Sequence, residues 1–116
     1  LMLAITREMN YSESTFVLPR AEGVERREGV ATRIFLRSGE VPFAGHPVLG
    51  TAFALWTRHK RRTDPSAKRL RLSLKAGILP VDFQPNDKGV WEGTMTQADP
   101  VFAERHEAAR IAPLLG

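Results

Sequence analysis

A histidine and a glutamate are the two side chains in this 116-residue sequence whose types and surroundings best suit chemistry. His46 lies within the run from Pro42 to Ala52, directly before Pro47 and an apolar stretch. A neutral imidazole can accept or donate a proton near pH 7. Glu13 lies where a predicted helix passes into a predicted strand, so its carboxylate can face a cleft shared by both. Both are candidates for proton transfer, but their spacing alone does not pair them.

Pro47 predicts that a helix begins just after His46. Proline fixes φ near the helical value, lacks an N–H group, and disfavours helical conformation at the residue before it. We therefore expect His46 at the cap, where the following backbone N–H groups carry partial positive charge and could bind an anionic substrate. Two simpler interpretations stay open: His46 merely caps the helix, and Glu13 is a solvated or capping carboxylate.

The segment from Val48 to Trp56 has no charged residue. A helix that is apolar all round is typical of a buried position, so we expect it to be enclosed on all sides. At ~9 to 12 residues it is far shorter than the ~20 needed to span a bilayer, so the enclosure should be protein and not membrane.

Apolar periodicity predicts the remaining elements. An opening helix carries Met2, Ile5 and Met9 at helical spacing, and no capping residue precedes Leu1, so we expect the chain to enter this helix from earlier sequence. We further expect strands at 14–18, 30–37, 69–75, 78–84 and 90–97, a loop over 21–29, and a final helix over 102–115 limited by Pro113. This order predicts one α+β domain: a curved, mostly antiparallel, incompletely wrapped sheet around the apolar helix.

Composition narrows the function classes. The net charge of +4 comes largely from two basic runs, Arg58 to Arg62 and Lys68 to Arg71, which we interpret as a solvated helix end and a solvated edge strand. Nucleic-acid binding through the first run stays an alternative, although no binding motif or interleaved aromatic residue supports it. The absence of cysteine excludes disulfides and fits a cytoplasmic location. The three histidines lack metal-ligand spacing, so we expect no metal.

Three runs of sequence, at 8–18, 33–35 and 40–52, together resemble the PhzF-like phenazine-biosynthesis family. The resemblance implies the fold of diaminopimelate epimerase, in which two similar lobes each wrap a barrel-like sheet around a central helix, with the active site between them. The central helix here would span about 47–58. Residues 1–116 would then be the N-terminal lobe, truncated at its start, with the second lobe and its aspartate absent from this chain.

The same resemblance implies roles for individual residues. Glu13 matches the catalytic glutamate, a general acid and base that works without metal or organic cofactor, and His46 matches the histidine that lines the site. Ser12 and Gly45 would contact the substrate. The family usually has Thr-Pro after Arg-Ile-Phe, where this sequence has Leu36 and Arg37.

The resemblance implies an isomerase that moves a proton on a small carboxylic acid, as the family's best-known member does with trans-2,3-dihydro-3-hydroxyanthranilate. It also implies a homodimer, and we expect neither a nucleic-acid nor a membrane partner. The alternative is a non-catalytic binding or interaction domain that has the same fold.

Overall fold

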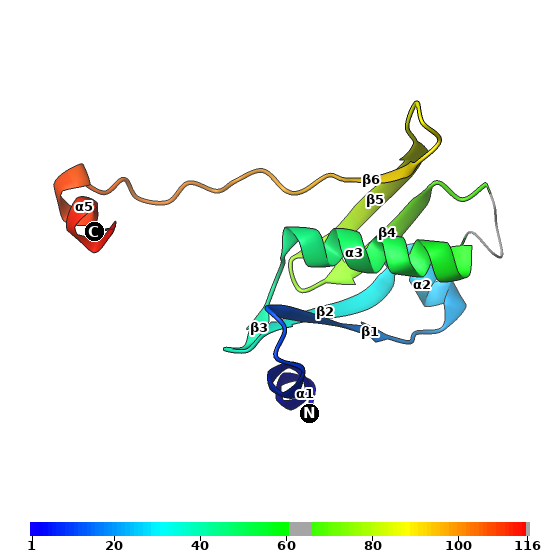
Figure 1. Cartoon of the computed structure of the whole chain (residues 1–116), viewed down its shortest axis with the longest axis horizontal. Coiled ribbons are helices and arrows are strands. Elements are labelled where there is room, and N and C mark those ends of the chain that lie inside the picture. Colours follow the sequence, from blue (N-terminus) through cyan, green and yellow to red (C-terminus); the bar gives the residue numbers. More distant parts are fainter. Residues whose placement is uncertain (61–65, 116) are drawn as a thin grey trace.

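The computed structural model describes residues 1–60 and 66–115, apart from the side chains of residues 59, 60 and 115. Its centre is a curved six-stranded sheet with one helix laid across it (Figure 1). The strands are β1 (Glu13–Leu18), β2 (Val30–Leu36), β3 (Glu40–Val41), β4 (Arg69–Leu74), β5 (Gly77–Pro85) and β6 (Trp91–Met95). The helices are α1 (Met2–Met9), α2 (Glu22–Glu28), α3 (Gly45–Leu55) and α5 (Ala108–Leu115), and a π-helical turn, η1 (Trp56–Lys60), follows α3.

The strands lie in the order β1, β2, β4, β5, β6, and β3 pairs with β2 beside that path. Among the described strands, β2 and β4 run parallel and the other neighbours are antiparallel. The predicted, mostly antiparallel curved sheet is therefore present. The sheet also contains the short strand β3, where no strand was predicted.

The middle strands bury one face and expose the other. Alternate residues of β4 and β5 are buried: Leu70, Leu72, Leu74, Leu79, Val81 and Phe83. Arg69 and Arg71 lie on the exposed face, which confirms the predicted alternation. The expectation that this basic segment is an edge strand is wrong, because β4 lies between β2 and β5. A central strand has a solvated face too, so alternation could not distinguish the two positions.

Helix α3 packs on the sheet along one side only. Val48, Ala52 and Trp56 are buried within the hydrophobic core. On the outer side Gly50 and Ala54 are exposed, and Phe53 is 42% exposed. Enclosure on all sides, expected from the apolar sequence, is therefore wrong for the part of the chain that the structure describes. The open sheet covers one side of the helix and leaves the other uncovered (Figure 1).

The helix begins earlier than Pro47 predicts. Ala44, with φ −154°, is the N-cap, and α3 starts at Gly45, so His46 is the second helical residue and not the cap. The first-turn N–H groups of a helix have no intrahelical partner, so proline is tolerated at the third position as well as the first. Helix α3 ends at Leu55, and the π-helical turn η1 follows it to Lys60. The helical conformation therefore extends slightly beyond the expected end near residue 58.

Residues 21–29, expected to form a hairpin loop, contain the helix α2. Its first turn is acidic and its last turn is basic, through Glu22, Glu25, Arg26 and Arg27. This arrangement complements the helix dipole and explains how a segment without an apolar stripe forms a helix. Acidic residues in the first turn and basic residues in the last turn predict a helix less strongly than apolar periodicity does. The glycines of this segment favoured a loop, so the helix was not predicted.

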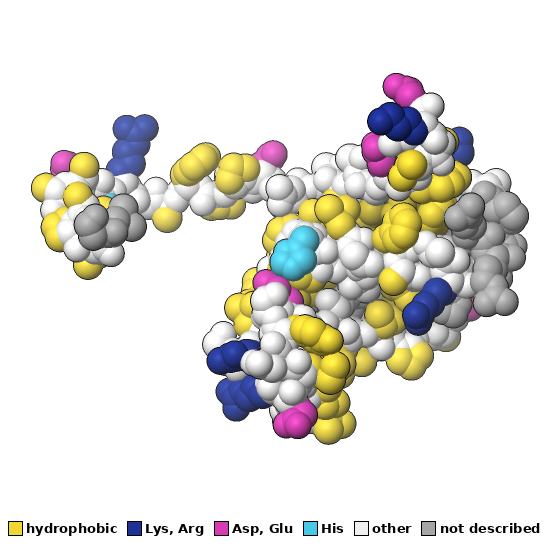
Figure 2. Space-filling view, viewed as in Figure 1, with side chains coloured by type: hydrophobic (Ala, Val, Ile, Leu, Met, Phe, Trp, Pro, Cys, Tyr) yellow, Lys and Arg dark blue, Asp and Glu magenta, His cyan; other side chains and the backbone are white. Residues whose placement is uncertain are grey.

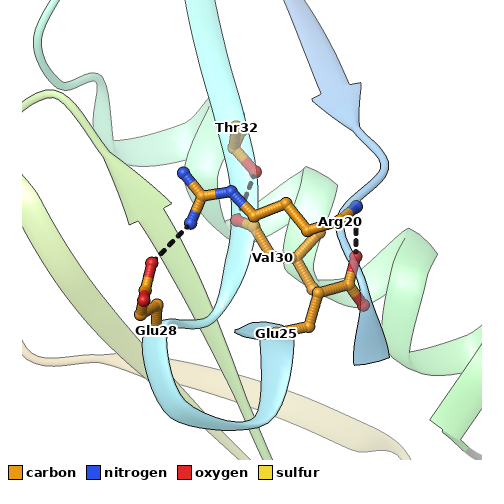
Figure 3. Close-up of polar contacts among 5 residues, drawn as sticks. All are labelled: Arg20, Glu25, Glu28, Val30 and Thr32. Carbon is orange, nitrogen blue, oxygen red and sulfur yellow. Dashed lines mark hydrogen bonds and ion pairs between the residues drawn. The ribbon is translucent and has the colours of Figure 1, made fainter. Parts of the chain in front are cut away.

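Contacts from Arg20 hold α2 in place (Figure 3). The backbone N–H of Arg20 donates to Glu25 at 3.3 Å, and its guanidinium donates to Glu28 at 3.2 Å. Gly29 then turns the chain into β2 with φ 84°, and a Cβ there would lie 2.7 Å from the carbonyl oxygen of Arg71. Only glycine fits this close approach between α2 and β4.

The C-terminal region leaves the sheet as an extended segment that ends in α5 (Figure 1). The helix expected from residue 102 starts only at Ala108, and Pro113 lies inside it. Val101 and Phe102 are 95% and 89% exposed, and hydrophobic side chains line this segment (Figure 2). Short helices depend on packing for stability, so helical spacing without a packing surface is not sufficient.

Two further expectations concern the surface. None of the described helices combines the length and the apolar character needed to cross a bilayer. In the first basic run, Arg58 is exposed, whereas residues 61 and 62 and the side chains of 59 and 60 lie outside what the structure describes.

Candidate active site

Glu13 and His46 meet where β1 and α3 both begin. Glu13 is the first residue of β1 and pairs in register with Leu36 of β2. His46 is the second residue of α3. The chain reaches α3 through β3, which pairs with the end of β2, so the start of the helix is held close to the start of β1.

The two side chains are in contact but differ in exposure. The Nε2 atom of His46 lies 3.4 Å from Oε2 of Glu13. The glutamate side chain is 19% exposed and the imidazole 79% exposed, so the carboxylate is mostly buried and the ring mostly faces solvent. The Oε2 atom is itself buried and has no hydrogen-bond partner among the described residues. The contact is thus within ion-pair distance, but its geometry does not satisfy the carboxylate oxygen.

Burying a carboxylate oxygen without a hydrogen bond lowers the stability of the folded state. The same oxygen remains able to accept a proton from a ligand. Desolvation without a compensating hydrogen bond costs on the order of 1 to 3 kcal/mol for a polar group, and more for a charged one. Glu13 could accept a proton from a substrate, and the His46 imidazole could form a hydrogen bond to the negative charge left on the substrate. The arrangement is therefore suited to general acid–base catalysis.

The first turn of α3 adds a place for an anion. Ala44 provides no side-chain cap, so no cap side chain bonds the first-turn N–H groups, which carry partial positive charge. At Gly45, an added Cβ would meet no heavy atom of the described residues within 4 Å. Packing in the described structure therefore does not require glycine at this position, and a ligand could approach the backbone there.

Ser12 lies beside this corner and not within its contacts. It is exposed, in a bend immediately before β1. The structure thus brings Glu13 and His46 into contact, whereas Gly45 and Ser12 are only their neighbours along the chain. His106, by contrast, is exposed in the extended segment before α5.

An ion pair between β2 and β3 steadies the approach to α3. Arg33 donates two hydrogen bonds to Glu40, from Nε to Oε1 at 2.9 Å and from Nη2 to Oε2 at 2.7 Å. This hydrogen bonding, aided by the guanidinium charge, holds the pKa of the Glu40 carboxyl below its usual range. The same contact raises the pKa of Arg33. Both groups stay charged at neutral pH and link the two strands.

One polar feature was not predicted from the sequence. Arg7, Asn10, Arg37 and Ser38 line a hollow of about 580 Å³ between the ends of α1 and β2. Their positions in the sequence match no binding motif. The hollow forms because α1 packs beside the end of β2 and so brings two separate segments together. Among the described residues, no three of histidine, cysteine, aspartate and glutamate gather closely enough to hold a metal ion.

Comparison with known proteins gives long matches. The chain is 40% identical over 116 residues to trans-2,3-dihydro-3-hydroxyanthranilate isomerase from Pseudomonas aeruginosa. This alignment covers 99% of the chain and 38% of that enzyme. It is 37% identical over 115 residues to the enzyme of the same name from Pseudomonas fluorescens, with the same coverage of both proteins, 99% and 38%. The chain thus spans 38% of the length of these curated relatives.

Solved structures share the architecture. A phenazine biosynthesis protein of the PhzF family from Bacillus anthracis superposes with a TM-score of 0.64 at 29% identity, over 81% of this chain and 29% of its own. A predicted epimerase from Pseudomonas aeruginosa gives a TM-score of 0.58 at 29% identity, over 81% of this chain and 30% of its own. These likenesses confirm the predicted α+β fold with its curled sheet. The model of the phenazine biosynthesis-like proteins matches residues 1–114, and the chain therefore belongs to this PhzC-PhzF family.

Proposed function

We propose that the complete protein is an isomerase that moves a proton on a small carboxylic acid, with Glu13 as its acid and base. One observation carries this proposal: the Oε2 atom of Glu13 is buried, has no hydrogen bond to any residue that the structure describes, and lies 3.4 Å from His46 Nε2. The names of the relatives support the reaction class, because they are isomerases of trans-2,3-dihydro-3-hydroxyanthranilate.

The chemistry needs only proton transfer. Glu13 takes a proton as a C–H bond of the substrate breaks, the electron pair shifts within the substrate, and Glu13 returns the proton to a different carbon. Atoms and electrons balance without an oxidant or reductant, because the product is an isomer. His46, beside the carboxylate, would position the substrate and stabilise charge that develops during transfer.

We further propose that the substrate carboxylate binds at the start of α3. The uncapped N–H groups and the open space at Gly45 suit a negatively charged group that approaches the backbone closely. Ser12, exposed beside Glu13, would add a hydroxyl contact to the substrate.

The larger assembly is also a proposal. Residues 1–116 would form part of an N-terminal lobe, and a second lobe would supply the opposite wall of the site, including an aspartate. The coverage of 38% of the relatives' length supports this division. We propose a cytoplasmic homodimer without nucleic-acid or membrane partners, and light scattering of the complete protein measures its oligomeric state.

The test of the catalytic role is Glu13→Gln in the complete polypeptide. We expect turnover and solvent-deuterium incorporation to fall by about 10² to 10⁴-fold, because the amide cannot accept the proton. Glu8→Gln is the matched control, since Glu8 is an exposed glutamate on α1. Unchanged deuterium incorporation in Glu13→Gln contradicts the role. Carboxylic acid binding without any proton exchange in the parent protein supports a non-catalytic binding domain instead.

A further inference from the structure

The hollow between α1 and β2 is a second concentration of polar groups, separate from Glu13 and His46. It measures about 580 Å³, and its lining consists of Arg7, Asn10, Arg37 and Ser38. All four residues are exposed. The hollow is open to solvent and has room for a small polar ligand, which charge and hydrogen bonds would hold.

Hydrogen bonds anchor both guanidinium groups in the hollow. Nε of Arg7 donates to the carbonyl oxygen of Arg37 at 2.9 Å, and Nη1 of Arg37 donates to Oδ1 of Asn10 at 2.8 Å. Asn10 is itself held at the end of α1, where its backbone N–H donates to Thr6 at 3.2 Å and its φ is 54°. Each of these contacts uses a single N–H of a guanidinium that has five.

The charge of the hollow is not neutralised. Arg20, Arg33 and Arg69 each pair with a carboxylate, whereas no described carboxylate forms an ion pair with Arg7 or Arg37. Beyond the two guanidinium groups, the lining supplies the Asn10 amide and the Ser38 hydroxyl, both of which can donate. Two fixed positive charges with free donors match an oxyanion, which guanidinium groups bind through paired hydrogen bonds.

The hollow and the candidate active site lie on different sides of the sheet. Helices α1 and α3 lie on opposite sides of the β1–β2 ribbon (Figure 1). Ile34 of β2 belongs to the core beneath α3, whereas Arg37, just past the strand, bonds to the end of α1. A ligand in the hollow would therefore not contact Glu13.

We propose that this hollow binds a small oxyanion, a phosphate or carboxylate group, through the guanidinium groups of Arg7 and Arg37. The site goes beyond the proposed isomerisation, because it lies apart from the proton-transferring residues.

The test is a titration of the complete protein with inorganic phosphate at constant ionic strength, followed through the arginine Nε–Hε NMR signals. We expect the signals of Arg7 and Arg37 to shift saturably, and Arg37→Gln to weaken binding by about tenfold through loss of a charge-assisted pair. A parallel titration with acetate distinguishes a phosphate source from a carboxylate source by which anion saturates at lower concentration. Arg27→Gln, at an exposed arginine on α2, is the matched control and should bind as the parent does.

Three results would overturn the proposal: no saturable shift with either anion, equal weakening by Arg37→Gln and Arg27→Gln, or unchanged binding in Arg37→Gln. The second result would mean that phosphate responds only to overall charge. Glu13→Gln should leave phosphate binding unaltered. The test of this anion site is therefore independent of the test of the proposed isomerase activity.

Discussion

The two ends of helix α3 differ in packing. At its C-terminal end Trp56 is 1% exposed, stacks on Phe83 with ring centres 4.6 Å apart, and donates from Nε1 to the Ala67 carbonyl oxygen at 2.7 Å. At its N-terminal end His46 is 79% exposed, and Gly45 has open space beside it. The buried end holds the helix on the sheet. The open end presents backbone N–H groups and an imidazole near a carboxylate with an unsatisfied oxygen.

The contrast teaches how one helix can serve both stability and chemistry. An unsatisfied buried carboxylate oxygen such as that of Glu13 destabilises a fold, so it persists only where other contacts supply the stability. The aromatic cluster of Trp56, Phe83 and Trp91 at the C-terminal end of α3 supplies such stability. We therefore expect substitutions at the two ends to separate loss of stability from loss of activity.

The largest effect on stability should come from the buried end. Trp56→Ala in the complete protein should lower the free energy of unfolding by about 3 to 5 kcal/mol, because it leaves a cavity against Phe83 and Trp91. Denaturant unfolding measures the change. If this variant does not fold, Trp56→Phe should fold and lose less, since it keeps a ring but not the N–H donor. An equal loss from His46→Ala would remove the distinction between the ends.

A methyl group at the open end should affect activity and not stability. Gly45→Ala should reduce turnover by about 10- to 100-fold, because the added Cβ displaces the substrate, while protein neighbours are unaffected. Gly50→Ala is the matched control, because a Cβ there also meets nothing within 4 Å. It should leave turnover unchanged and stabilise the helix by up to about 1 kcal/mol. Full activity of Gly45→Ala would mean that no ligand approaches this backbone.

The imidazole itself should contribute little to folding. His46→Ala should change the free energy of unfolding by less than about 0.5 kcal/mol, as expected for an exposed side chain away from the core. The same variant should lose activity in proton-exchange assays. A loss of stability without a loss of exchange would indicate that His46 serves the helix and not the substrate.

The smallest effect is a pH dependence of the sheet beneath α3. Arg69 of β4 donates to Asp82 of β5 at 2.5 and 3.0 Å, and this hydrogen bonding holds the pKa of the aspartate below its usual range. Because the folded-state pKa is lowered, the pair stabilises the fold above the unfolded-state pKa. That contribution is lost as the pH falls through the folded-state value.

Unfolding measured from neutral to acidic pH should therefore show a small loss of stability that Asp82→Asn lacks. The exposure of both side chains, 64% and 46%, keeps the effect small because solvent screens the pair. Glu8→Gln, at an exposed glutamate of α1, controls for the general effect of removing a carboxylate. Parallel pH profiles for Asp82→Asn and the parent protein would show that the pair does not contribute.

Much of the fold could be predicted because apolar alternation is local. The leucines of β4 and the run of Leu79, Val81 and Phe83 in β5 appear in the sequence as they lie in the core. The position of β4 between β2 and β5 could not be predicted, because strand pairing joins distant segments. Helix α2 was missed because it is stabilised by charge order and by contacts from Arg20. The start of α3 was misplaced because proline fits several first-turn positions.

The sequence by itself determined the types of most elements, the apolar helix, and the presence of Glu13 and His46 within recognisable family motifs. Only the tertiary structure decided that these two side chains lie 3.4 Å apart, with a buried, unsatisfied oxygen between strand and helix. It also decided that α3 has one open side, and that Arg7 and Arg37 share a hollow. The physical reason is that periodicity is a property of neighbouring residues, whereas burial, unsatisfied donors and charge proximity arise only when distant segments pack.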